Sequence, residues 1–212
     1  MTAHNETAPL DGRARILAAA LKVFASHGFE GSSLRQIATE ANAQHQLLVY
    51  HFKTKDALWR AVIESIFEET WREQGPLEYW SARLQTVGPA AALREMIRAF
   101  ANFSTKHPQF QRMLSFEGAE DNERLEWLMQ TIARPHFELS VAAIRAAQAA
   151  GLAQPGNPGR LHYAMIAIIT HSLVYAKEFR LMTGLDPFSA EQVEITVELA
   201  CRVLGLRDAE RP

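Results

Sequence analysis

Residues 28–58 read GFEGSSLRQIATEANAQHQLLVYHFKTKDAL and contain the start and stop signals of two short helices. Ser33 followed by Gln36 is a capping box, which predicts a short helix over residues 34–41. After a tight turn, a second short helix is expected from about 44 to 51, because its apolar positions fall on one face. Two short helices joined by a few residues are typical of a helix-turn-helix unit.

The sequence on either side of this pair supplies two further helices. The turn itself is expected at Asn42, because asparagine tolerates the left-handed backbone that a tight turn needs. Residues 11–27 place their apolar side chains on one helical face, and Gly28 is predicted to end that helix in a left-handed cap. Thr54 caps the next helix, which is expected to run to roughly Gln74.

The rest of the chain is predicted to form longer helices separated by proline and glycine. Strand signals are nearly absent from it. The expected elements are a helix after Gly88-Pro89 that ends at His107-Pro108, a short helix over 110–118, a long helix over 121–150 interrupted near Pro135, a loop over 151–159, and helices over 160–182 and 190–204, the last opened by Ser189. The sequence therefore predicts an all-α fold of about nine helices.

Composition and charge narrow the class of protein. The chain has 212 residues, of which 48% are hydrophobic, and a formal net charge of −2, so it is not a general polyanion binder. Residues 1–55 carry six Lys or Arg against four Asp or Glu, whereas the remainder is acidic. With one cysteine, Cys201, we expect no internal disulfide and no multi-cysteine zinc site, and its apolar helix position predicts burial.

No segment is predicted to target or anchor the chain. Every apolar run is interrupted well before the ~20 residues that would span a bilayer. The first ten residues lack the basic and apolar regions of a secretion signal, so a cytoplasmic location with no membrane partner is expected.

The chemistry of the predicted second short helix is that of a DNA-reading helix. Its first turn carries Gln44, His45, Gln46 and Leu47, three of which can hydrogen-bond to base edges in the major groove. Tyr50, His51, Lys53 and Lys55 follow closely, and such donors suit the phosphate oxygens that flank the groove. The alternative interpretation of these residues is an ordinary solvated surface.

Two runs of residues carry a resemblance to a known family. The run from Gly28 to Ala38, and the run from Leu48 to Leu58, resemble the N-terminal DNA-binding domain of TetR-type transcriptional regulators over residues 12–62. The resemblance implies a DNA-binding domain over 1–55, a helical body over 56–212 that binds a small-molecule effector and a second copy of the chain, and a fourth helix from about 55 that links them.

The resemblance also implies which side chains bind double-stranded DNA. These are Ser33, Arg35, Gln44, His45, Gln46, Leu47, Tyr50, His51 and Lys55. The chain departs from the family in having Asn42 where glycine is usual and Val49 where an aromatic residue is usual. It also lacks Arg or Lys in the reading turn, so guanine contacts are expected from Arg35 instead.

In the body, the last two predicted helices are apolar on more than one face. Such a pair needs a second partner, so a two-fold, four-helix interface between two copies of the chain is expected. The alternative is that these faces are buried entirely within one copy. An apolar cavity with a few polar groups would bind the effector. Its candidate residues are Phe100, Phe103, Met113, Glu117, Trp127, His136, His171 and Tyr175.

The sequence thus predicts a sequence-specific transcriptional regulator, most simply a ligand-responsive repressor that binds a palindromic operator as a dimer. The alternative is a helical small-molecule-binding protein or enzyme without DNA recognition, and Asn42 and Val49 keep it open. Against an enzyme, the sequence has no Gly-rich phosphate loop and no His-Glu-x-x-His motif. We expect no catalytic residues, no cofactor and no metal.

Overall fold

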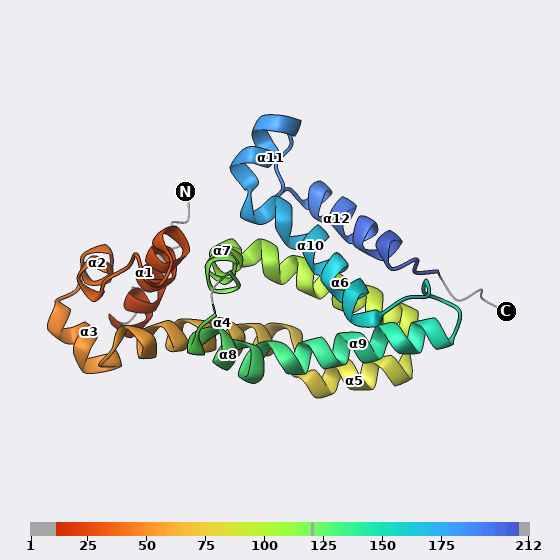
Figure 1. Ribbon diagram of the computed structural model, residues 1–212, viewed down its shortest axis with the longest axis horizontal. Helices are drawn as coiled ribbons and strands as arrows, with labels where there is room; N and C mark the ends of the chain where they lie inside the picture. Colours follow the sequence, from red (N-terminus) through yellow and green to blue (C-terminus); the bar gives the residue numbers. More distant parts are fainter. Residues whose placement is uncertain (1–11, 120, 208–212) are drawn as a thin grey trace, which may run out of the picture. The chain divides into compact units, whose positions relative to one another are not determined.

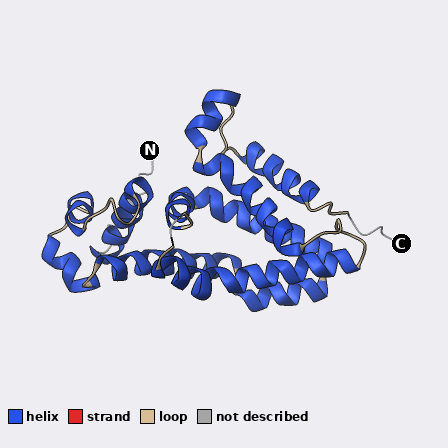
Figure 2. Cartoon of the chain, viewed as in Figure 1, coloured by secondary structure: helices blue, strands red, loops and turns tan. Residues whose placement is uncertain are grey.

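The structure of the protein is a computed structural model that describes residues 12–119 and 121–207. In that part of the chain it is all-helical, with twelve α-helices and one π-helical segment and no strand (Figures 1 and 2). The all-α prediction is confirmed, although the helices are more numerous and shorter than the nine expected. The chain divides into two compact units, the first ending at Phe67 and the second beginning at Glu68.

The first unit is the predicted helix-turn-helix with its two flanking helices. It consists of α1 (Gly12–His27), α2 (Leu34–Glu40), α3 (His45–Phe52) and the first part of α4 (Lys55–Gln74). One core holds these helices together, because each contributes apolar side chains with essentially no exposure. These side chains are Ile16, Ala20, Phe24, Ile37, Leu48, Leu58, Trp59 and Ile63. The expected unit boundary at residue 55 and the observed one after Phe67 differ because the start of α4 shares this core.

The second unit contains the remaining helices. They are α5 (Leu77–Thr86), α6 (Pro89–Lys106), α7 (Pro108–Glu117), α8 (Glu123–Leu128), the π-helix η1 (Met129–Ala133), α9 (Arg134–Ala149), α10 (Pro158–Val174), α11 (Ala176–Thr183) and α12 (Ala190–Val203). Helices α6, α9, α10 and α12 surround the main core, which includes Leu93, Ile144, Ile169 and Val197. Cys201 lies in this core and is 3% exposed, so its predicted burial is confirmed.

The interruption predicted near Pro135 takes the form of a π-helical turn. Proline lacks a backbone N–H, and its ring clashes with the carbonyl group four residues earlier in a regular helix. The wider π-helical turn over Met129–Ala133 precedes that position, and Pro135 occupies the first turn of α9. The chain therefore stays helical through the break.

Two expectations for the second unit are wrong. The single helix predicted over 160–182 is split at Tyr175, whose backbone (φ −101°, ψ 37°) leaves the helical region, so that α11 starts anew (Figure 1). The chain then turns at Gly184 and returns along α10 as α12. Helix α5 was not expected, although Leu77, Trp80 and Leu84 recur at the i, i+3, i+7 spacing of a helical face and are half-buried.

Candidate nucleic-acid interface

The turn between α2 and α3 is built by local hydrogen bonds. At the start of α2, the Ser33 hydroxyl oxygen accepts a hydrogen bond from the backbone N–H of Gln36 at 3.2 Å, as the capping box predicts. At its end, the N–H of Ala43 donates to the carbonyl of Ala38 at 2.9 Å. Asn42 has φ 47°, which confirms the left-handed turn predicted there. These contacts fix where α3 begins.

Helix α3 separates an apolar inner face from a polar outer face. Leu48 and Phe52 are buried against the rest of the first unit. On the opposite side Gln44, His45 and Gln46 are exposed, and the side chain of Gln44 makes no capping bond although Gln44 is the N-cap residue. Their hydrogen-bonding groups face away from the protein. A helix that contacts base edges in the major groove must present polar side chains outward in this way.

Leu47 differs from its three polar neighbours. It is partly exposed, but its side chain lies against the start of α1, since a Cβ atom added to Gly12 would be 3.7 Å from Leu47 Cδ2. At that distance a Cβ atom would make an ordinary van der Waals contact, so Leu47 lies next to the backbone of α1 at Gly12. Of the four residues of this turn, Leu47 is therefore the one whose side chain lies near α1.

The end of α3 presents an exposed aromatic and imidazole pair. The Tyr50 side chain is 79% exposed, and its ring lies edge-on to that of His51 with the centroids 5.3 Å apart. His51 is exposed as well. On α2, Arg35 is exposed, and no hydrogen bond or ion pair joins its guanidinium to another described residue. These three side chains are available for contact with phosphate or base.

Lys55 has a different environment from the one that the sequence predicts. Its ammonium donates hydrogen bonds to the carbonyl oxygens of Phe29 at 2.8 Å and Ser32 at 3.0 Å, and lies 4.1 Å from the centre of the Phe29 ring. Lys55 therefore ties the start of α4 to the α1–α2 turn. Sequence reasoning missed this contact because the acceptors are backbone carbonyls 23 and 26 residues away. A phosphate contact by Lys55 would have to use its remaining N–H.

The candidate effector residues of the second unit fall into three groups by exposure. Phe103, Met113 and Glu117 are buried, Phe100, Trp127 and His136 are half-buried, and His171 and Tyr175 are exposed on α10 and just after it. The last two make a ring contact with centroids 4.9 Å apart. The structure therefore does not bring the eight residues into one cavity.

The buried polar members of this set already have protein partners. The Glu117 carboxylate at the end of α7 accepts hydrogen bonds from Asn122 Nδ2 and Arg124 Nε, each at 3.2 Å. His136 is hydrogen-bonded through Nδ1 to the carbonyl of Ile132 at 2.9 Å, and burial lowers the pKa of its imidazole. Each of these groups is satisfied without a ligand.

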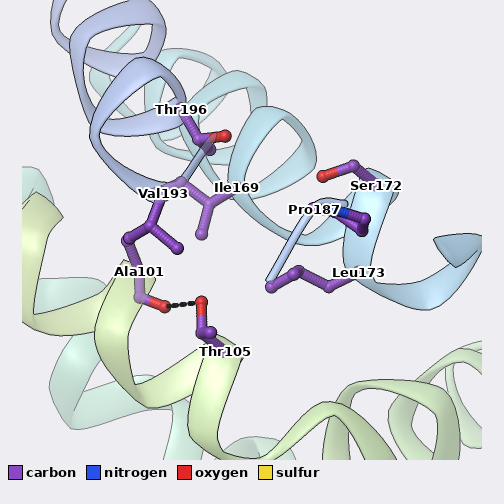
Figure 3. Close-up of a pocket in the computed structure, with 8 residues that line it drawn as sticks. All are labelled: Ala101, Thr105, Ile169, Ser172, Leu173, Pro187, Val193 and Thr196. Atoms are coloured by element: carbon purple, nitrogen blue, oxygen red, sulfur yellow. Dashed lines mark hydrogen bonds between the residues drawn. The ribbon is translucent and has the colours of Figure 1, made fainter. Parts of the chain in front are cut away.

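A small hollow lies elsewhere in the second unit, between α6, α10, α12 and the segment before α12 (Figure 3). It has a volume of about 190 Å³, part of which is open to solvent. Its lining consists of Ala101, Thr105, Ile169, Ser172, Leu173, Pro187, Val193 and Thr196, and it includes none of the eight predicted residues. The Thr105 hydroxyl is already bonded to the carbonyl of Ala101. Because that volume includes open solvent, the hollow itself has room for about one water molecule, far less than a small-molecule site needs.

Residues 12–119 and 121–207 contain neither a candidate metal site nor a membrane-spanning helix. No group of three or more His, Cys, Asp or Glu side chains in these ranges could hold a metal ion. No helix in the described part of the chain is both long enough and apolar enough to cross a bilayer.

The α2–α3 geometry and the outward polar face of α3 together define a helix-turn-helix protein. Comparison with known proteins agrees with this class. Residues 16–62 match the family model described as bacterial regulatory proteins, tetR family, and residues 89–204 match the model described as the tetracyclin repressor-like C-terminal domain. The second match alone covers more than half of the chain. The chain belongs to the tetR family of bacterial regulatory proteins, and it is a DNA-binding transcriptional regulator.

Individual relatives show the extent of the similarity. The HTH-type transcriptional regulator RutR of Escherichia coli is 29% identical over 198 residues, which cover 91% of this chain and 89% of RutR. The HTH-type transcriptional repressor NicS of Pseudomonas putida is 33% identical over 105 residues, which span 50% of this chain and 47% of NicS. Among solved structures, AibR in complex with isovaleryl coenzyme A and operator DNA has the same fold, with a TM-score of 0.71 at 15% identity, covering 93% of this chain and 100% of that chain.

Proposed function

We propose that this protein is a repressor that binds a palindromic operator as a homodimer and leaves it when a small-molecule effector binds. The observation that carries the proposal is the outer face of α3, where Gln44, His45 and Gln46 are exposed above the buried Leu48. The printed names of the relatives support it, because NicS is a repressor and AibR was solved with both an acyl coenzyme A and operator DNA. Since its target would be chromosomal DNA, we propose a cytoplasmic site of action.

We assign the two activities to the two units. The first unit would contact DNA through Ser33, Arg35, Tyr50 and His51 in addition to the first turn of α3. The second unit would bind the effector and the second copy of the chain. The candidates for the effector site that are buried or half-buried stay Phe100, Phe103, Met113, Glu117, Trp127 and His136.

The proposed dimer interface lies on the outer faces of α10 and α12. Tyr163 of α10 is 64% exposed in the single chain, and Ile195 and Leu199 of α12 are 43% and 45% exposed. Three large, exposed apolar side chains on two neighbouring helices indicate a surface that a partner would bury. A two-fold pairing of α10 and α12 would cover them in a four-helix arrangement. His171 and Tyr175, which are exposed, lie at one end of this surface.

Selection of bound duplexes from a random DNA pool tests the proposal directly. We expect the enriched sequences to contain an inverted repeat, because two copies of α3 related by a two-fold axis read the same half-site in opposite directions. The half-site spacing then gives the separation of the two reading helices. Absence of any enriched sequence would favour the alternative, a small-molecule-binding protein without DNA recognition.

Ligand response is tested on the selected duplex. A library of small metabolites, with acyl coenzyme A compounds among them, is screened for binding to the protein by thermal shift. An effector should weaken the protein–DNA complex by a coupling free energy of about 1–3 kcal/mol. By reciprocity, the duplex should weaken effector binding by the same factor. If compounds that bind the second unit leave the affinity for the duplex unchanged, the ligand-responsive part of the proposal is wrong.

A further inference from the structure

The chain adopts an unfavourable backbone conformation immediately after the DNA-reading helix. Helix α3 ends at Phe52, and the next residue, Lys53, has φ 61° and ψ −51°. The N–H of Thr54 donates a hydrogen bond to the carbonyl of Phe52 at 2.6 Å across it. This is the γ-turn with a positive φ at its central residue, a conformation that is rare and strained for L-amino acids.

The residue type makes the strain unusual. Asn42 and Lys53 are the non-glycine residues with positive φ in the described part of the chain. The short polar side chain of asparagine is often found in this region of the backbone map, whereas lysine has no such tolerance. Glycine would adopt the turn without a steric penalty. The chain thus has a lysine at a position where the backbone conformation favours glycine.

The ammonium of Lys53 also differs from most other cations of the first unit in having no partner there. Lys22 pairs with Glu40, and Lys55 is held by backbone carbonyls. By contrast, no hydrogen bond or ion pair joins the Lys53 ammonium to any residue of 12–119 or 121–207, and the residue is exposed. Lys53 follows the exposed Tyr50 and His51, with the buried Phe52 between.

We propose that Lys53 is a phosphate-binding residue for duplex DNA, and that the strained γ-turn places its ammonium beside Tyr50 and His51 at the edge of the groove. The proposal rests on the proposed DNA-binding function. It adds to that function a phosphate contact by Lys53 and the backbone turn that positions the lysine. Backbone strain persists at functional positions when the surrounding fold determines it. Here Leu58, buried in α4, and Phe52, buried in α3, hold the two ends of the turn.

Three variants of Lys53 separate charge from strain. K53A removes the ammonium and keeps the strain, K53G removes both, and K53R keeps both. Lys22→Ala is the matched control, because it also removes one cation from the first unit, but one that is already paired with Glu40. Affinity for the inverted-repeat duplex selected with the wild-type protein is measured between 50 and 200 mM salt, and thermal unfolding is measured without DNA.

The expected results differ between the variants. Each phosphate contact contributes about 0.9 to the slope of log affinity against log salt, so K53A and K53G should each lower the slope of a dimer by about 1.8. Their affinity deficit relative to wild type should then be roughly 12-fold larger at 50 mM than at 200 mM salt. K53R and K22A should keep the wild-type slope. K53G should melt about 2–4 °C above K53A, since glycine relieves the strain.

The outcomes that overturn the proposal are distinct. A wild-type slope for both K53A and K53G would show that Lys53 makes no phosphate contact. Equal melting temperatures for K53A and K53G would show that the turn is not strained. Failure of the wild-type protein to select any duplex would overturn the proposed function and this contact with it, and the thermal comparison would still report on the strain.

Discussion

Gln46 is the residue from which most of the sequence specificity is expected. It is exposed in the first turn of α3, two residues before the buried Leu48 that fixes the orientation of the helix. A glutamine amide can donate to and accept from one adenine edge. We expect Gln46→Ala to cost roughly 1–3 kcal/mol at one base pair of each half-site and to relax the preference at that position. Competition binding over single-base variants of the selected duplex measures this.

The control for this prediction is another exposed glutamine changed in the same way. Gln85→Ala lies on α5 of the second unit and should leave the binding profile unaltered. An identical profile for Q46A and the wild-type protein would remove Gln46 from the base-reading residues.

Lys55 is expected to act on stability more than on DNA affinity. Its two hydrogen bonds to the Phe29 and Ser32 carbonyls join α4 to the α1–α2 turn. Lys55→Met keeps most of the stem but loses both bonds, and we expect the free energy of unfolding to fall by about 1–2 kcal/mol. Urea denaturation measures this loss. Lys53→Met, at a lysine without such bonds, should cost less, and equal losses in the two variants would contradict the positioning role of Lys55.

At the residue scale, the sequence predicted local contacts well and distant ones poorly. Ser33 and Asn42 were read correctly because their partners lie within a few residues. The carbonyl partners of Lys55 are far away along the chain, and backbone acceptors leave no sequence signal. The proximity of Leu47 to the start of α1 was also missed, because the two segments are far apart along the chain.

At the element scale, helices were predicted where caps and buried faces coincide. Ser189 opens α12 by accepting a hydrogen bond from the N–H of Gln192, as its sequence motif indicates. Helix α5 has no side-chain cap and no fully buried residue, so its signal in the sequence is limited to the helical spacing of Leu77, Trp80 and Leu84. The break at Tyr175 has no proline or glycine to mark it. Local sequence patterns therefore could not predict that break.

The packing of α9 on α10 makes stability depend on pH. His162 of α10 is hydrogen-bonded through Nδ1 to the Ser140 hydroxyl of α9 at 2.9 Å and packs edge-on to Phe137. Burial lowers the pKa of His162 from 6.5 to about 4, because the charged imidazolium is poorly solvated there. The fold therefore favours the neutral ring. The stabilisation is complete above pH 6.5 and is lost as the pH falls toward 4.

His162→Gln tests this dependence. Between pH 7 and pH 5 the wild-type protein should lose about 2 kcal/mol of unfolding free energy that the variant does not lose. Urea denaturation of both proteins at the two pH values gives the difference between their losses. Burial also lowers the pKa values of His107 and His136, but both proteins contain these residues, so their contributions cancel when the two losses are subtracted. The exposed His45→Gln variant should follow the wild-type protein. Parallel losses in H162Q and wild type would exclude His162 as the cause.

At the scale of the whole molecule, the proposed dimer is the feature on which recognition of an inverted repeat would depend. Leu199→Glu places a carboxylate on the outer face of α12, where the proposed partner would bury it. We expect such a buried, unpaired charge to weaken association by roughly 3–5 kcal/mol or more, and affinity for the inverted repeat to fall with it. Sedimentation equilibrium measures the association directly.

Val87→Glu is the matched control for the dimer prediction. This residue is also a partly exposed apolar side chain of the second unit, but it lies between α5 and α6, outside the α10 and α12 surface. The V87E chain should associate as the wild-type chain does. A dimer that survives L199E would place the interface elsewhere.

From the sequence, this surface could be predicted only as apolar positions on several faces of the last helices. The sequence of one chain does not specify which of those faces would pack against a second copy.

The burial of Cys201 has a practical consequence. It is the single thiol of the chain and lies in the core shared by α6, α9, α10 and α12, where burial raises its pKa. An alkylating reagent can reach it only when those helices open. The rate of labelling therefore reports the opening of the body without any engineered probe, and its change on adding a metabolite would reveal ligand-induced tightening before any operator is known.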